Sequence, residues 1–374
     1  MAGLVAQKNY DWQDSNLALF GSDVEKDLKK SAAEGEEAWH KAGKKPGTQI
    51  WRINKFKVEA WPEKDYGNFF KGDSYIILHT YKEKDSDELN YDLHFWIGEE
   101  STQDEYGTAA YKTVELDTYL DDKPIQHREV QGFESALFKS YFPQLSYWKG
   151  GVESGFKKMS DRIEKHEPKL LHFRGDRHGI SVNQIPLNRK NLRSDDVFFL
   201  DLYDVAFQWN GRTCNKDEKF KATQYANNLK NERMGKLKVI HVLDDPINDE
   251  DDLNTFFSHF PETCDEVYET AKFEGKCVKK LYRLSDATGK LEFTLVAENN
   301  FSESALDTND VFIVESQKEL FVWIGKKTSL RERKNAMIFG EKYLREHSDN
   351  RCKAITCISE GVGKRNNHFY ECFS

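Results

Sequence analysis

The sequence predicts an α+β protein made of three tandem repeats, each a central mixed sheet flanked by a long helix and a shorter helix. The motif Trp-x-Gly occurs three times, starting at Trp96, Trp209 and Trp323, which stand 113 and 114 residues apart. Such regular self-similarity is typical of a repeat protein. Within each repeat, short turns rather than helices separate the apolar runs, and this favours a mixed sheet with the helices packed on it.

In the first repeat, Trp-x-Gly ends a strand and leads into the long helix. Polar and apolar residues alternate through residues 91–97, which is the period of a strand, and Gly98 breaks the pattern. Thr102 and Glu105 then have the spacing of a capping box at a helix start. The other two repeats also carry a Glu nine residues after the Trp, preceded by a polar capping candidate: Asn215 with Glu218, and Ser329 with Glu332.

An Asp opens an apolar strand upstream of each Trp, namely Asp73, Asp196 and Asp310. The Asp-to-Trp spacing is 13 residues in the second and third repeats and 23 in the first, where the segment YKEKDSDELN lengthens the hairpin. The same carboxylates therefore recur at the same places in each repeat.

The remaining elements follow from local patterns. In the first repeat we expect strands at 50–53, 56–60 and 127–130 and a short amphipathic piece at 133–142. The predicted division is an extension at 1–48, domains at 49–152, 169–261 and 278–374, and linkers at 153–168 and 262–277.

The second repeat should carry its long helix at 217–229. After it, HVLDDPINDEDDLN lacks the central Gly of an EF-hand loop, so we expect a solvated acidic turn. In the third repeat, KKLYRLSD, LEFTLVAE, DVFIVES, ELFVWIG and AITCISE read as strands and residues 331–346 as a helix.

Composition excludes several classes of function. The net charge of −9 argues against nucleic acid as the main partner. No apolar run approaches the roughly 18 residues of a membrane span. The six cysteines form no C-x-x-C pair, which favours reduced thiols and a cytoplasmic location.

The sequence lacks the common catalytic motifs, including G-x-S-x-G, H-E-x-x-H and the P-loop, so we do not expect an enzyme. His94 lies in a strand beside Trp96 and is interpreted as a packed core histidine. The chemical lead is the recurring Asp–Glu pair, because two carboxylates with backbone carbonyls suit calcium, a hard cation. From spacing alone, each Glu could equally well serve only its capping box.

Several segments resemble the gelsolin/villin family. They are the region from Asp73 to Leu120, with HREVQGFES and GGVESGF, in the first repeat, then FLDL, KAT and NERMGKLKVIHV in the second, and LVAE, FVWIGK and ERK in the third. With three repeats, the chain is similar to the severin/fragmin type. The resemblance implies a monomeric cytoskeletal protein that binds actin monomers and filaments, and that severs filaments and caps their barbed ends under calcium control. In this family, nucleation and phosphoinositide regulation accompany these activities. The alternatives are a capper that does not sever and a phosphoinositide-binding scaffold.

The resemblance also assigns calcium (Ca²⁺) ligands. A site in the first repeat would use the carbonyls of Gly72 and Val152 with Asp73 and Glu105. A second ion, shared with actin, would use Asp117 and carbonyls near Asp122 and Pro124. The second repeat would use the Asp195 carbonyl, Asp196, Glu218 and a further acid, for which Glu269 aligns best and Asp265 is the alternative. The third would use the Asn309 carbonyl, Asp310 and Glu332, although the family's C-terminal acid falls on Lys364.

Actin and lipid contacts are implied in the same way. Tyr111, Glu115 and Thr118 should lie on the face of the long helix that points away from the core and should contact actin. The linker residue Phe156 and the basic residues Arg189, Lys190 and Arg193 should lie along the filament side. A phosphoinositide segment would use Lys169, Arg174 and Arg177.

Overall fold

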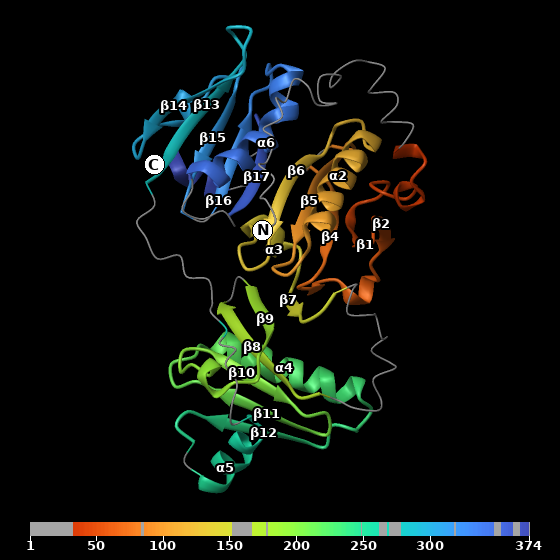
Figure 1. The fold of residues 1–374 in the computed structure, drawn as a ribbon, viewed down its shortest axis with the longest axis vertical. Helices are drawn as coiled ribbons and strands as arrows, with labels where there is room; N and C mark the ends of the chain where they lie inside the picture. The colour runs from red at the N-terminus through yellow and green to blue at the C-terminus, as the bar shows by residue number, and fades with distance from the viewer. Residues whose placement is uncertain are drawn as a thin grey trace, which may run out of the picture.

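The computed structural model describes residues 33–83, 86–151, 167–176, 179–247, 249–261, 268, 278–317, 319–347, 353–361 and 367–373. It confirms the α+β class. The described strands form a sheet of ten strands, in the order β14-β13-β15-β16-β17-β6-β5-β4-β1-β2, and a sheet of seven, in the order β12-β11-β10-β8-β9-β7-β3. Each long helix lies against the strands of its own repeat (Figure 1).

The first repeat is a central sheet with α2 on one face and a cluster of aromatic residues on the other. Its elements are η3 (Glu37–Trp39), β1 (Gly47–Asn54), β2 (Lys57–Ala60), η4 (Glu63–Asp65), β3 (Asn68–Phe70), β4 (Ser74–Lys82), β5 (Leu89–Ile97), α2 (Gln103–Tyr119), β6 (Ile125–Val130), α3 (Ala136–Ser140) and β7 (Leu145–Trp148). Trp96 lies at the centre of the aromatic cluster and stacks on Phe69 at 5.0 Å and on Tyr147 at 6.0 Å.

The second and third repeats reproduce this plan. The second consists of β8 (Lys169–Asp176), β9 (Gly179–Ile185), η7 (Arg189–Asn191), β10 (Val197–Asp201), β11 (Val205–Asn210), α4 (Lys216–Glu232), β12 (Val239–Asp244) and α5 (Glu250–Ser258). The third consists of β13 (Lys280–Ser285), β14 (Glu292–Glu298), η8 (Glu303–Ala305), β15 (Val311–Glu315), β16 (Glu319–Ile324), α6 (Leu330–His347), β17 (Ala354–Ser359), α7 (Asn367–Tyr370) and η10 (Glu371–Phe373). In the described part of the chain, no helix combines the length and apolar character that crossing a bilayer requires.

The acidic segment of the second repeat corrects one expectation. Residues 250–258 form the helix α5 rather than a solvated turn. The Asp249 side chain caps its start by accepting bonds from the amides of Asp251 and Asp252. Acidic side chains stabilise the first turn of a helix because the unpaired amides there carry partial positive charge. The buried Phe256 anchors the helix to the core.

The Trp-x-Gly turn has the same geometry in all three repeats. The glycine amide donates to the carbonyl of the strand-leading Asp, at 3.0, 3.0 and 3.1 Å in the first, second and third repeats. A Cβ on Gly98, Gly211 or Gly325 would lie 2.2, 2.6 and 2.2 Å, respectively, from the nearest backbone oxygen. A side chain therefore does not fit at these positions.

The sheets extend across the boundaries between repeats, which differs from the expectation of one sheet in each unit. Strand β17 pairs antiparallel with β6, and β7 of the first repeat pairs with β9 of the second (Figure 1). The contact between the first and third repeats also includes bonds from Nη1 of Arg128 to the Lys353 carbonyl at 3.3 Å and from the Ala136 amide to Glu319 at 3.1 Å. Periodicity predicts strands but not which edges meet.

His94 is fully buried, as its strand position indicated. Its Nδ1 lies 2.9 Å from Oε1 of Glu129, which also accepts a bond from the Ser135 hydroxyl at 2.8 Å. Burial raises the pKa of Glu129 to about 7 and lowers the pKa of His94. Within this network, the sequence expectation of a core histidine is confirmed.

The turn geometry leads to a stability prediction for the first repeat. Gly98→Ala places a Cβ against the backbone, so we expect the free energy of unfolding to fall by about 3 kcal/mol. Gly107→Ala is the matched control, because nothing lies within 4 Å of its added Cβ. In the middle of a helix this control should stabilise by about 0.5–1 kcal/mol. Denaturant melts of the two variants measure both effects. Equal stability of the two variants would contradict the conclusion that no side chain fits at Gly98.

Candidate functional site

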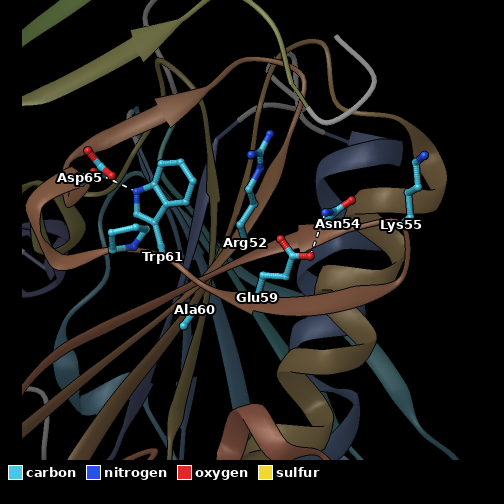
Figure 2. Close-up of a pocket in the computed structure, with 8 residues that line it drawn as sticks. Arg52, Asn54, Lys55, Glu59, Ala60, Trp61 and Asp65 are labelled. Atoms are coloured by element: carbon cyan, nitrogen blue, oxygen red, sulfur yellow. Dashed lines mark hydrogen bonds between the residues drawn. The ribbon is translucent and has the colours of Figure 1, made fainter. Parts of the chain in front are cut away.

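The strand-leading Asp73 of the first repeat is fully buried beside a basic side chain. Its Oδ2 atom forms an ion pair with Nη2 of Arg52 at 2.5 Å and accepts a bond from the Tyr75 hydroxyl at 3.3 Å. Figure 2 shows Arg52 lining a surface pocket together with Trp61. A buried carboxylate is costly unless it is paired, so Arg52 accounts for the stability of this arrangement.

The segment that leads to Val152 passes against the other oxygen of this carboxylate. A Cβ on Gly151 would lie 2.8 Å from Oδ1 of Asp73. The Gly72 amide donates to the Gly150 carbonyl at 2.9 Å. The structure thus brings together Gly72, Asp73 and residues 150–151, whereas Val152 lies outside the described residues.

Glu105 stands at the start of α2 and forms the predicted capping box with Thr102. Its Oε2 also accepts a bond from the Ser101 hydroxyl at 3.4 Å. That hydroxyl lies 2.8 Å from the hydroxyl of Ser74, the residue after Asp73. The helix start and the strand start are therefore linked through side chains.

In the second repeat the charge of Asp196 acts on Glu218. Oδ2 of Asp196 accepts bonds from Nε2 of His172 at 2.8 Å and from Arg193 at 3.3 Å. Glu218 accepts a bond from the Gly175 amide at 3.1 Å and caps α4. Burial raises the pKa of Glu218, and the negative charge of Asp196 raises it further. Asp195 is exposed, and Glu269 and Asp265 lie outside the described residues.

The third repeat has the same arrangement. Oδ2 of Asp310 contacts Arg283 twice, through Nη2 at 2.5 Å and Nε at 2.8 Å. Glu332 accepts a bond from the Asp286 amide at 2.8 Å and exchanges capping bonds with Ser329. Asn309 precedes Asp310 as predicted, and Lys364 lies outside the described residues.

The capping role of the three glutamates is thus confirmed. Capping does not prevent the same carboxylates from binding a metal. Within the described residues, no group of three or more His, Cys, Asp or Glu side chains converges on one point. Calcium nevertheless accepts carbonyl and water oxygens beside one or two carboxylates. Two observations fit calcium: the close approach of the backbone at Gly151 to Asp73 Oδ1, and the negative charge of Asp196 near Glu218, whose pKa it raises.

The candidate ligands of the second calcium ion lie at the C-terminal end of α2. Oδ2 of Asp117 accepts a bond from the Gln126 amide group at 2.7 Å, and its carbonyl accepts one from the Asp122 amide at 3.0 Å. Pro124 follows two residues later. Burial raises the pKa of Cys357 in β17 to about 12, and the charge of Asp117 adds to this shift. The third repeat therefore lies beside this end of α2.

The exposed face of α2 differs in part from the expectation. Tyr111 is 63% exposed, as predicted, and Tyr106 and Val114 are exposed beside it. The expectation is wrong for Glu115 and Thr118. Glu115 accepts a bond from the indole of Trp39 at 2.8 Å, and Thr118 is buried. For Glu115 the reason is that Trp39 of η3, which precedes the first strand, lies against this side of the helix.

The predicted basic residues of the second repeat lie in two settings. Arg189 and Lys190 are exposed on η7, and Arg189 stacks on Phe257 at 4.7 Å. Arg193 instead contacts Asp196, so it belongs to the carboxylate site. On β8, Arg174 is exposed and Nζ of Lys169 lies 5.8 Å from the centre of the Trp148 ring. Phe156 and Arg177 lie outside the described residues.

The fold and the sites define a protein of three repeats, each with a buried Asp at a strand start and a capping Glu at the start of a long helix. The gelsolin repeat family matches residues 55–139, 178–245 and 292–369. This chain therefore belongs to the gelsolin family.

Three relatives match this chain over different shares of their own lengths. The chain is 48% identical over 349 residues to gelsolin-like protein 2 of Lumbricus terrestris, covering 92% of each chain. It is 42% identical over 352 residues to severin of Echinococcus granulosus, again covering 92% of each. It is 40% identical over 304 residues to gelsolin of Gallus gallus, covering 79% of this chain and 38% of that protein.

The burial pattern around α2 predicts which residues support the fold and which are free for a partner. Trp39→Ala removes a fully buried side chain and its bond to Glu115, so it should destabilise the protein by about 3–5 kcal/mol. Tyr111→Ala removes an exposed ring and should change stability by less than about 0.5 kcal/mol. Thermal melts of both variants test this. A large loss of stability in Tyr111→Ala would mean that Tyr111 packs against the protein itself.

Proposed function

We propose that this chain is a calcium-dependent actin-binding protein that severs actin filaments and caps their barbed ends. The observation that carries the proposal is the presence of three gelsolin repeats in a chain 42% identical to a severin over 92% of both lengths. In each repeat the strand-leading Asp and the capping Glu are in place. No catalytic role is proposed for any residue.

The exposed face of α2 is the proposed actin contact. Tyr106, Tyr111 and Val114 form an apolar and aromatic surface on a helix that is held rigidly against the sheet. Exposed aromatic side chains on rigid elements are common anchors of protein interfaces. This surface suits a hydrophobic groove on the actin monomer, and capping requires such a contact at the filament end.

Severing requires a second contact, with the side of the filament. Arg189 and Lys190 project from η7 of the second repeat and give it a positive surface. Complementary charge accelerates association and orients partners, and this suits an acidic filament. Phe156 precedes the second repeat in the sequence and lies outside the described residues, so its contact with the filament stays a prediction.

Calcium dependence is proposed from the contacts of the candidate ligands. Calcium would supply positive charge to Asp73, Asp117 and Asp196. In the arrangement described here, β17 pairs with β6, and the charge of Asp117 reaches Cys357 on that same strand. The end of α2 that would share calcium with actin thus lies close enough to the third repeat for the charge of Asp117 to act on Cys357. Actin binding there competes with this contact between the repeats.

Regulation by phosphoinositides remains a prediction. It rests on Lys169 and the exposed Arg174 of β8, with Arg177 following them in the sequence. Arginine suits phosphate groups because its guanidinium presents several donors in one plane. A headgroup bound at β8 would lie in the repeat that carries the proposed side-binding surface.

The calcium proposal predicts the loss of one ion when one site is removed. Asp73→Asn combined with Glu105→Gln should lower the number of bound calcium ions by one in isothermal titration calorimetry. Binding to the native state stabilises it by about 2.7 kcal/mol per site at a hundredfold excess over Kd. The double variant should therefore show a smaller calcium-induced rise in Tm. An unchanged stoichiometry would show that the ion is not bound there.

The side-binding proposal predicts a separation of two activities. Arg189→Glu with Lys190→Glu should reduce severing and filament co-sedimentation, while binding to monomeric actin through α2 stays unchanged. The matched control reverses two exposed lysines elsewhere in the same repeat, Lys236→Glu with Lys238→Glu. Single-filament microscopy measures cutting directly. Undiminished cutting by the first variant would exclude η7 as the side-binding element.

A further inference from the structure

A basic side chain occupies the same position on one strand of every repeat. This strand is β1, β8 or β13, and it pairs with the strand that the buried Asp opens. In each repeat the basic residue pairs with the residue two positions after that Asp. The three register pairs are Arg52 with Tyr75, His172 with Phe198, and Arg283 with Phe312.

The contact with the Asp is equally regular. In each repeat the basic group approaches Oδ2, at 2.5 Å from Arg52, 2.8 Å from His172 and 2.5 Å from Arg283. In the first repeat, Oδ1 is the oxygen that faces Gly151 and the segment leading to the proposed carbonyl ligand. The two oxygens of the carboxylate therefore have different surroundings, with the basic group on one side and the proposed metal site on the other.

We infer that Arg52, His172 and Arg283 are positioning residues for calcium. Each holds Oδ2 of the strand-leading Asp and so keeps Oδ1 directed toward the metal site. This inference rests on the proposed calcium binding. Hydrogen-bond partners of a metal ligand fix its orientation, and losing one typically weakens metal binding by about 10–100-fold.

The first repeat shows why the basic residue stays in place rather than swinging away when the site is filled. Arg52 is buried beside Trp61 (Figure 2). Its guanidinium lies 5.6 Å from the Trp61 ring centre and 5.3 Å from that of Phe70. Both rings stabilise a cation by cation–π attraction. Arg283 is held less firmly, because its side chain is 42% exposed. Calcium binding should therefore depend on the positioning residue most strongly in the first repeat.

The test measures calcium binding by isothermal titration calorimetry on the full-length chain. Arg52→Met keeps much of the volume of the side chain but removes its charge and donors, and it should weaken one calcium site by about 10–100-fold. Arg52→Lys keeps the charge and should recover most of this loss. Lys64→Met, which removes an exposed charge from the same repeat, should bind calcium like the wild type.

Each outcome is decisive. If Arg52→Met has a lower Tm in chelator but an unchanged calcium affinity, Arg52 only stabilises the fold, and this overturns the inference. Tighter binding in Arg52→Met would make the arginine a competitor of calcium, which also overturns it. If Arg52→Met does not fold, Arg283→Met gives the same comparison in the third repeat, where the side chain is more exposed. If Asp73→Asn leaves the number of bound ions unchanged, the proposed calcium site itself is wrong, and the inference falls with it.

Discussion

The strand-leading Asp connects the backbone and the charge distribution of every repeat. Its carbonyl accepts the amide of the Trp-x-Gly glycine, which fixes the turn into the long helix. Its buried carboxylate is paired with an arginine of the neighbouring strand in the first and third repeats and accepts a bond from His172 in the second. Because a buried charge without a partner is strongly unfavourable, the strand pair, the turn and the helix start must assemble together. One residue thus sets the geometry on which the candidate metal sites depend.

Local patterns in the sequence were sufficient to predict the three repeats and their capping boxes. Alternation predicted β5, and the spacing of Thr102 and Glu105 predicted the start of α2, because both depend on neighbours within a few residues. Contacts between distant segments were not predictable in this way. The ion pair of Arg52 with Asp73 depends on strand register, and the burial of Glu115 depends on a Trp 76 residues away.

The helix α5 shows how two local signals can conflict. The run of acidic residues suggested a solvated turn, but the apolar side of the same segment buries Phe256. The acids at positions 249–252 stand at the start of the helix, where negative charge is favourable. The sequence likewise showed that Lys169 and Arg174 are charged, but not what surrounds each side chain. Alternation on β8 places Lys169 near Trp148 and Arg174 in solvent.

The pairing of β17 with β6 has a consequence for solubility. Each strand is an edge of its own repeat, and the join between them includes the pairs Ile355–Arg128 and Thr356–His127. Any separation of the first and third repeats leaves two unpaired strand edges, and open edges are templates for pairing with other chains. Arg128 and Lys353 lie at this join, but their charges are paired, with Glu341 at 3.7 Å and with Glu315 at 2.8 Å. Keeping the first and third repeats joined therefore protects both edges from pairing with other chains.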